Sequence, residues 1–149
     1  RHHRRNQRGG GARLGGQGMR VTVDTNILVR AVVCDDPEQA GIAARLLTDA
    51  ELIAVALPCL CEFAWVLRRV YGFQPADVAA AIHALLATAS VQANRPAVEA
   101  GLSVLEAGGD FADGVIAHEG KWLGGETFMS FDRKAVALLA AQGQSARLL

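Results

Sequence analysis

The amino-acid sequence predicts an α/β fold, in which a central parallel sheet lies between two layers of helices in a three-layer α/β/α sandwich. The first reason is that short apolar, β-branched runs alternate along the chain with helical patterns of ten or more residues. The second is that several helical patterns open with proline or an acidic residue and end at glycine. With 149 residues, 51% of them hydrophobic and 20% charged, the chain suits a single globular domain.

The expected strands and helices follow one another in a regular order. Residues 20–23, "RVTV", alternate and are β-branched, so we expect a short strand that leads into Asp24. Asp35 and Asp36 form a cap signal, and Pro37 follows at the first helical position of "DDPEQAGIAARLLTDA". The other expected elements are a helical segment in "NILVRAVV", a strand at 52–57, a helix from Pro58 to Gly72, a helix from Pro75, a weak strand in "SVQA", a helix from Pro96 to Gly108, a helix in "DFADGVIAHEGKWLGG", a strand at 127–131, a helix in "DRKAVALLAAQG" and a last strand in "ARLL".

The first 18 residues, "RHHRRNQRGGGARLGGQG", differ in composition from the rest. They contain five arginines, no acid and no apolar stretch of the kind found in a signal peptide. Because glycine and arginine cannot form a core, we expect residues 1–18 to be a leader from an expression vector or upstream translation, with a nucleic-acid-binding arm as the alternative. The folded domain is then expected to span 19–149, with ten basic against fifteen acidic residues and a net charge of about −5.

The number of cysteines and the length of the apolar runs predict the compartment in which the protein works. Three cysteines are an odd number without zinc-ligand spacing, so we expect reduced thiols and a cytoplasmic protein. The uninterrupted apolar runs are too short to span a bilayer, so no membrane partner is expected.

Five carboxylates fall where helices begin rather than on solvated helix faces. Asp24 and Asp132 each follow an expected strand, and the carboxyl ends of parallel strands border the ligand crevice of such sheets. Glu62 lies in the first turns of an otherwise apolar helix, where we expect it to have little contact with water. Asp110 and Asp113 are three residues apart at a helix start, so they share one face.

Structural roles for these acids remain open. Asp24, Asp110 and Asp132 are each placed to act as a helix N-cap. Glu62 has a possible ion-pair partner in Arg68 or Arg69.

The functional interpretation is a metal site made of oxygen ligands alone. Clustered carboxylates raise one another's pKa values unless a cation lies among them. Such a site, without His or Cys, selects Mg²⁺ or Mn²⁺, which bind phosphate oxygens as further ligands. Hydrolysis of a nucleic-acid backbone is the reaction that this chemistry suits.

Four segments carry a resemblance to a known family: "VDTNILVR", "PCLCEFAWVLRRVYG", "GGDFADGVIAHEG" and "TFMSFDRKAV". In order and spacing they resemble the PIN-domain ribonucleases, and within them the VapC-type toxins of bacterial toxin-antitoxin pairs. The resemblance extends over essentially all of residues 19–149. It implies an α/β/α sandwich, a Mg²⁺ or Mn²⁺ site, endonucleolytic cleavage of RNA, a cognate VapB-like antitoxin and a homodimer.

The resemblance also implies roles for particular acids. The metal-binding acids correspond to Asp24, Asp113 and Asp132, with Asp110 as the accompanying acid one turn before Asp113. The helix glutamate of the family corresponds to Glu62. We expect Asp24, Glu62, Asp113 and Asp132 to form the catalytic set around one or two ions, with Glu62 either a ligand or the base that orients water.

Small polar residues are expected to support these acids. Thr25, Asn26 and Ser130 match positions that orient the acids by hydrogen bonds in the family. Ser130 stands where threonine is commoner, and it keeps the hydroxyl group.

RNA binding needs local basic residues, because the net charge of the folded part is negative. Arg133 and Lys134, which follow Asp132 directly, are the favoured RNA contacts. Further candidates for this basic rim are Arg30, Arg68, Arg69 and Arg95.

Two other functions stay open at this point. One is a PIN-fold binding module that acts mainly through an antitoxin and operator complex. The other is a Mg²⁺-dependent phosphoryl-transfer domain of receiver type, in which Glu62 would have no role. The chain has neither a G-x-S-x-G nucleophile motif nor a G-x-x-x-x-G-K-[ST] phosphate loop.

Overall fold

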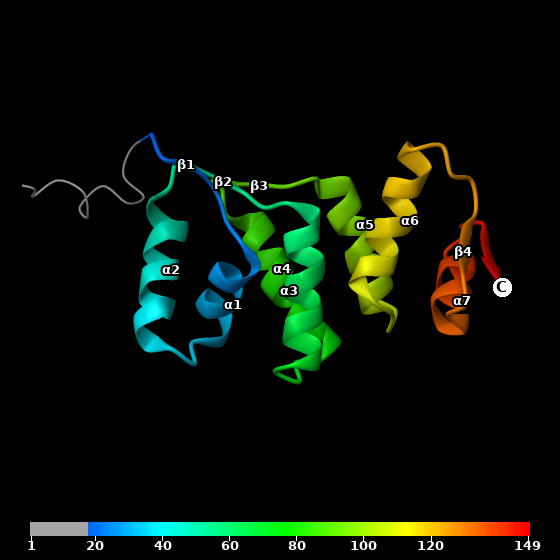
Figure 1. Cartoon of the computed structure of the whole chain (residues 1–149), viewed down its shortest axis with the longest axis horizontal. Coiled ribbons are helices and arrows are strands. Elements are labelled where there is room, and N and C mark those ends of the chain that lie inside the picture. The colour runs from blue at the N-terminus through cyan, green and yellow to red at the C-terminus, as the bar shows by residue number, and fades with distance from the viewer. Residues whose placement is uncertain (1–17) are drawn as a thin grey trace, which may run out of the picture.

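The computed structural model describes residues 18–149 and confirms an α/β fold with parallel strands (Figure 1). Apart from Gly18, the expected leader at 1–18 lies outside the described residues. The elements are β1 (Arg20–Thr22), α1 (Thr25–Val33), α2 (Pro37–Asp49), β2 (Leu52–Ala54), α3 (Leu57–Arg69), α4 (Pro75–Ala87), β3 (Val91–Gln92), α5 (Arg95–Glu106), α6 (Phe111–Trp122), β4 (Phe128–Ser130), α7 (Arg133–Ala141) and β5 (Ala146–Leu148).

The strands lie in two sheets rather than in one continuous sheet. In the first, β1 pairs with β2 and β2 with β3, so that Val21, Ile53 and Val91 are aligned; in the second, β4 pairs with β5. Figure 1 shows α5 and α6 between the two sheets. Each strand has only two or three residues, so the strand ladders contribute few hydrogen bonds and helix packing decides where the strands lie.

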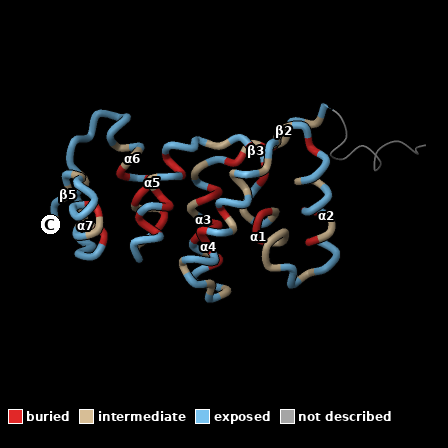
Figure 2. Tube along the Cα trace, turned by 180° about the vertical axis from the view of Figure 1, so that it is seen from behind, coloured by how far each residue is buried: buried red, intermediate tan, exposed pale blue. Residues whose placement is uncertain are grey.

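The hydrophobic core has a large and a small part. Val21, Ile53 and Val91 point toward the large cluster, which the helices α1, α3, α4, α5 and α6 also line. The small cluster joins Val104 of α5 and Ala117 of α6 to Leu139 of α7. In Figure 2 the buried segments gather in the middle of the molecule, and the C-terminal part is mostly exposed. The segment from β4 to β5 is therefore anchored on α5 and α6.

Helices α5 and α6 cross in close contact, and this contact positions the start of α6. A Cβ atom on Gly114 would run into the carbonyl group of Ala100, and one on Gly101 would lie 2.6 Å from the ring of Phe111. Glycine at these two positions lets the helix backbones approach each other.

Replacement of Gly114 by alanine is expected to lower the free energy of unfolding by about 1–3 kcal/mol, because the added methyl group overpacks a backbone contact that cannot move aside. The matched control is Gly120→Ala in the same helix, where no atom lies within 4 Å of the new Cβ. This control is expected to stabilise the protein by up to about 1 kcal/mol. Urea unfolding of both variants measures the difference, and equal stabilities would contradict the close crossing.

Within residues 18–149, none of the helices combines the length and the apolar character needed to cross a membrane.

Candidate metal centre

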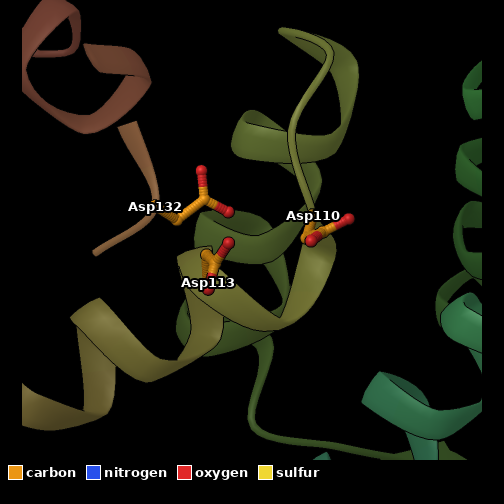
Figure 3. Close-up of side chains that lie close together, drawn as sticks. All are labelled: Asp110, Asp113 and Asp132. Carbon is orange, nitrogen blue, oxygen red and sulfur yellow. The ribbon is translucent and has the colours of Figure 1, made fainter. Parts of the chain in front are cut away.

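Three aspartates from two helix starts form the acidic trio Asp110, Asp113 and Asp132. One carboxylate oxygen from each lies within 4.8 Å of the others. Figure 3 shows Asp113 and Asp132 pointing toward each other, with Asp110 beside them at the beginning of α6. Among the residues that the structure describes, it is the one group of three or more potential ligands that lies this close together.

The trio concentrates negative charge at a partly buried position. Asp113 is half-buried, and its pKa is raised first by burial and then by the negative charges of Asp110 and Asp132. A cation among the three carboxylates would relieve this repulsion. Three carboxylates without His or Cys are the donor set that Mg²⁺ and Mn²⁺ prefer, so the residues present fit such an ion.

Two of the five acids do cap helices. Oδ1 of Asp132 accepts hydrogen bonds from the amides of Lys134 (3.0 Å) and Ala135 (3.1 Å). Oδ1 of Asp24 accepts one from the amide of Ile27 (3.1 Å). Each cap uses one oxygen and leaves the other oxygen for a further ligand. Asp110 stands at the N-cap position of α6, but its side chain makes no capping hydrogen bond.

The side chain of Ser130 supports Asp132. Its Oγ accepts a hydrogen bond of 2.9 Å from the amide of Asp132, which fixes the backbone at the point where β4 passes into α7. Together with the two capping bonds, this contact orients the carboxylate.

Asp24 and Glu62 form a second acidic group, separate from the trio. Thr25 Oγ1 donates a hydrogen bond of 3.0 Å to Glu62 Oε2, which joins the start of α1 to α3. Both acids influence the neighbouring Cys59 thiol, whose pKa is raised first by burial and then by the charges of Asp24 and Glu62. The structure therefore brings together Asp110, Asp113 and Asp132, but it does not bring Asp24 and Glu62 to them. Asn26 lines a different cavity, beside Asp24 and Ile27.

Glu62 is exposed, whereas its apolar sequence neighbours predicted little contact with water. The helix α3 buries Cys59, Phe63 and Leu67 and turns Glu62 outward. Among the described residues, the ion pairs are Arg30 with Asp35 and His83 with Glu106, so neither Arg68 nor Arg69 pairs with Glu62.

Basic side chains surround the trio. One cavity is lined by all three aspartates together with Lys134, Arg68 and Arg69. The sequence favours Arg133 and Lys134 as RNA contacts and offers Arg68 and Arg69 as further candidates; Lys134, Arg68 and Arg69 line this cavity. No local pattern in the sequence places Arg68 and Arg69 beside the trio, because their position depends on how α3 packs next to the start of α6. Arg30 is bound to Asp35 at 2.8 Å, and Arg95 donates to the carbonyl of Leu86, so these two are engaged elsewhere.

Comparison with known proteins agrees with this arrangement. Residues 21–139 match the family model described as PIN domain, which is more than half of the chain. A search of curated proteins finds no match. PIN domains are in general metal-dependent nucleases, so the family supports a hydrolase that acts on nucleic acid. The aspartates at the starts of α6 and α7 lie within the matched residues, and the chain belongs to the PIN-domain family.

Proposed function

We propose that the protein is a metal-dependent endoribonuclease that hydrolyses RNA phosphodiester bonds, and that it is a VapC-type toxin neutralised by a cognate VapB-like antitoxin. The observation that carries the nuclease proposal is the acidic trio within a PIN domain. The toxin assignment rests on the resemblance of four sequence segments to this subgroup.

The trio would hold the divalent ion, Mg²⁺ or Mn²⁺. Such an ion, when bound, supplies Lewis acidity that makes water more acidic and stabilises negative charge on a phosphate. The half-buried position of Asp113 keeps part of the site away from bulk water. The amides of Lys134 and Ala135 donate to the carboxylate of Asp132, and the Ser130 hydroxyl accepts from the backbone amide of Asp132.

The basic side chains around the trio would bind the RNA backbone. Arg68, Arg69 and Lys134 line the same cavity as the carboxylates, so a phosphate in this cavity meets three cations. Arg133 is exposed beside Lys134 and extends this basic rim. These contacts offset locally the negative net charge of about −5 of the folded part.

Asp24 and Glu62 would complete the catalytic set. Thr25 holds Glu62 by a hydrogen bond, and Asp24 keeps one oxygen free, so both carboxylates are oriented. We propose that they orient the attacking water or bind a second ion. We also propose that the protein acts as a homodimer in the cytoplasm, where its RNA substrate and antitoxin are found.

The test is incubation of the purified protein with total RNA in Mg²⁺ or Mn²⁺ and, in parallel, in EDTA. We expect internal cleavage with the metal ions and none with EDTA, because the carboxylates alone only repel phosphate. Cleavage that persists in EDTA would contradict the metal dependence. Binding of RNA without any cleavage would favour the binding-module function instead.

A further inference from the structure

We propose that a nucleobase of the RNA binds in a second cavity beside the acidic trio, where it stacks on the indole of Trp65. The phosphate next to this base would lie at the trio, with Arg68 and Arg69 between the base and the metal centre. The inference rests on the proposed function for the identity of its ligand, and it assigns a binding site to one part of the RNA.

Two cavities meet at the acidic trio, and they differ in character. The first holds all three aspartates together with basic side chains. The second, which we name the base pocket, shares Arg68, Arg69, Asp110 and Asp113 with the first and lies where α3 contacts the start of α6. Its other lining residues are apolar or nearly so: Cys61, Ala64, Trp65, Leu105, Phe111 and Ala112. A nucleotide is divided in the same way into a charged phosphate and a flat ring with an apolar face.

Trp65 presents a large aromatic surface at the base pocket. It is 59% exposed, whereas its apolar neighbours Phe63 and Ala64 are buried. Arg68 and Arg69 follow Trp65 by three and four residues, so they lie beside it on the same exposed side of α3. An exposed indole leaves apolar surface in water, which is unfavourable. A base stacked on this indole would cover that surface.

The floor of the base pocket belongs to the packed core. Ala64 of α3, Leu105 of α5 and Phe111 of α6 are all buried members of the large cluster. Because three helices hold these side chains, the pocket is already formed without a ligand. Binding of a rigid, flat ring in a preformed pocket requires little ordering of the protein.

The two arginines at the boundary between the cavities differ in their contacts. Arg68 donates a hydrogen bond of 2.9 Å to the carbonyl of Phe73, which holds its guanidinium in place. Arg69 makes no ion pair with a residue that the structure describes, so its charge is available to a ligand. A phosphate at this boundary would receive charge-assisted hydrogen bonds while its base enters the base pocket.

The charged residues of the base pocket favour a nucleotide over a protein segment as the occupant. Four of its lining residues are charged, namely Arg68, Arg69, Asp110 and Asp113. Charged residues are depleted in the buried centre of protein–protein interfaces, because they lose their hydration there. A nucleotide instead brings a phosphate, which complements the arginines directly.

The lining of the base pocket predicts recognition of the face of a base rather than of its edges. The side chains of Ala64, Leu105 and Phe111 offer no hydrogen-bonding group, and the thiol of Cys61 offers only a weak one. We therefore expect the pocket to accept any base. Purines should bind more tightly than pyrimidines, because their larger rings stack over more of the indole.

Binding in EDTA tests the base pocket without cleavage. The probes are a short, labelled oligoadenylate and an abasic oligomer of the same length, which carry the same phosphates. We expect the unmodified protein to bind the oligoadenylate about 5- to 150-fold more tightly, the range for stacking of one base on an aromatic side chain. Fluorescence anisotropy measures both affinities. Equal affinities, or no measurable binding of the oligoadenylate, would overturn the proposal.

Variants of Trp65 test which side chain provides this preference. Trp65→Ala is expected to remove most of the preference for the oligoadenylate, because both oligomers then make only phosphate contacts. Trp65→Phe keeps an aromatic ring and should keep most of it. Circular dichroism checks that both variants are folded. An unchanged preference in folded Trp65→Ala would contradict stacking on this residue.

The matched control is Trp122→Ala, which removes another exposed tryptophan. Trp122 is 82% exposed and ends α6, about 14 Å along the helix from Asp113. We expect this variant to keep the full preference for the oligoadenylate. Equal losses in Trp65→Ala and Trp122→Ala would show nonspecific stacking and would overturn the proposal.

Fluorescence of Trp65 tests the contact without removing it. The chain has two tryptophans, so Trp65 is the only one left in a Trp122→Phe chain. We expect the oligoadenylate to change the emission of this indole and the abasic oligomer to leave it unchanged. Unchanged emission when the oligoadenylate is saturating would contradict the stacking.

Light scattering after gel filtration tests whether a second copy of the chain covers Trp65 instead. We expect the unmodified protein and Trp65→Ala to have the same oligomeric state. If Trp65→Ala is monomeric, the unmodified protein is dimeric and the preference for the oligoadenylate is unchanged, Trp65 belongs to an interface between copies, and the proposal is overturned.

Cleavage kinetics separate the base pocket from the proposed function. In Mn²⁺ we expect Trp65→Ala to raise KM by about 5- to 150-fold and to leave kcat nearly unchanged, because the indole contacts the base and not the reacting phosphate. An unmodified protein that prefers the oligoadenylate but cleaves no RNA would refute the nuclease function and leave the base pocket intact. An active nuclease without this preference would refute the base pocket alone.

Discussion

Replacement of Asp113 by asparagine is expected to lower Mn²⁺-dependent RNA cleavage by at least about 100-fold, since loss of groups that only orient metal ligands already costs 10- to 100-fold. Asp113 is the half-buried member of the trio, and its pKa is raised by burial and then by the charges of Asp110 and Asp132. The amide of asparagine keeps the size of the side chain and removes the negative charge that binds the ion. Single-turnover cleavage of a labelled RNA at saturating Mn²⁺ measures the loss.

The same variant is expected to stabilise the protein in EDTA. The pKa of Asp113 is raised above its ordinary value of 3.8, so the folded state binds this proton more tightly than the unfolded state. The favourable contribution of this carboxyl to stability is therefore complete below pH 3.8, the ordinary pKa of the unfolded state. It is lost as the pH rises through the higher pKa of the folded state. At neutral pH the charged group destabilises the metal-free protein, and asparagine removes this effect.

Thermal unfolding against pH, in EDTA, checks this stability prediction. We expect the unmodified protein to lose stability relative to Asp113→Asn as the pH rises above 3.8. Glu99→Gln, an exposed acid on α5, is the control and should change neither cleavage nor this pH dependence. A lower melting temperature for Asp113→Asn at neutral pH would show that the trio is not under repulsive strain.

Replacement of Glu62 by glutamine is expected to lower cleavage about as much as Asp113→Asn does. The affinity of the trio for Mn²⁺ should stay within about 10-fold of that of the unmodified protein. The reason is that Glu62 belongs to the other acidic group, where Thr25 holds it. Asp24→Asn is expected to behave in the same way, because asparagine still caps α1. Cleavage assays and calorimetric titration with Mn²⁺ measure the two quantities separately.

The comparison of cleavage with Mn²⁺ binding in these variants tests the role of the second acidic group, Asp24 and Glu62. Loss of cleavage with retained Mn²⁺ binding supports a role in orienting water or a second ion. Full cleavage by both variants would show that Asp24 and Glu62 take no part in the reaction. Glu51→Gln, an exposed acid outside both groups, serves as the control for a general loss of negative charge.

Much of the local structure followed from the sequence. Proline at the start of α2, α4 and α5 and the alternation "RVTV" predicted helices and a strand that the structure contains. β2 is shorter than the expected strand at 52–57 and ends at Ala54, because α3 begins at Leu57, just before Pro58. Hydrophobic period and helix-start signals act over a few neighbouring residues, which is why the sequence can predict them.

The sequence by itself determined which residue types meet at helix starts. Asp110 and Asp113 are three apart on one helix, and their proximity follows from helix geometry alone. Asp132 lies beside them and Asp24 does not. This difference depends on which strands pair and on how α5 packs on α6. Strands of two or three residues carry too few side chains to specify their neighbours.

The tertiary structure also decided what surrounds the acids. It turned Glu62 toward solvent and placed Arg68 and Arg69 at the trio, because the buried face of α3 fixes the direction of every other side chain on that helix. It anchored the segment from β4 to β5 on α5 and α6, so that β4 and β5 form a sheet of their own. Such contacts join residues far apart in the chain, so their energies are set by packing that no local pattern encodes.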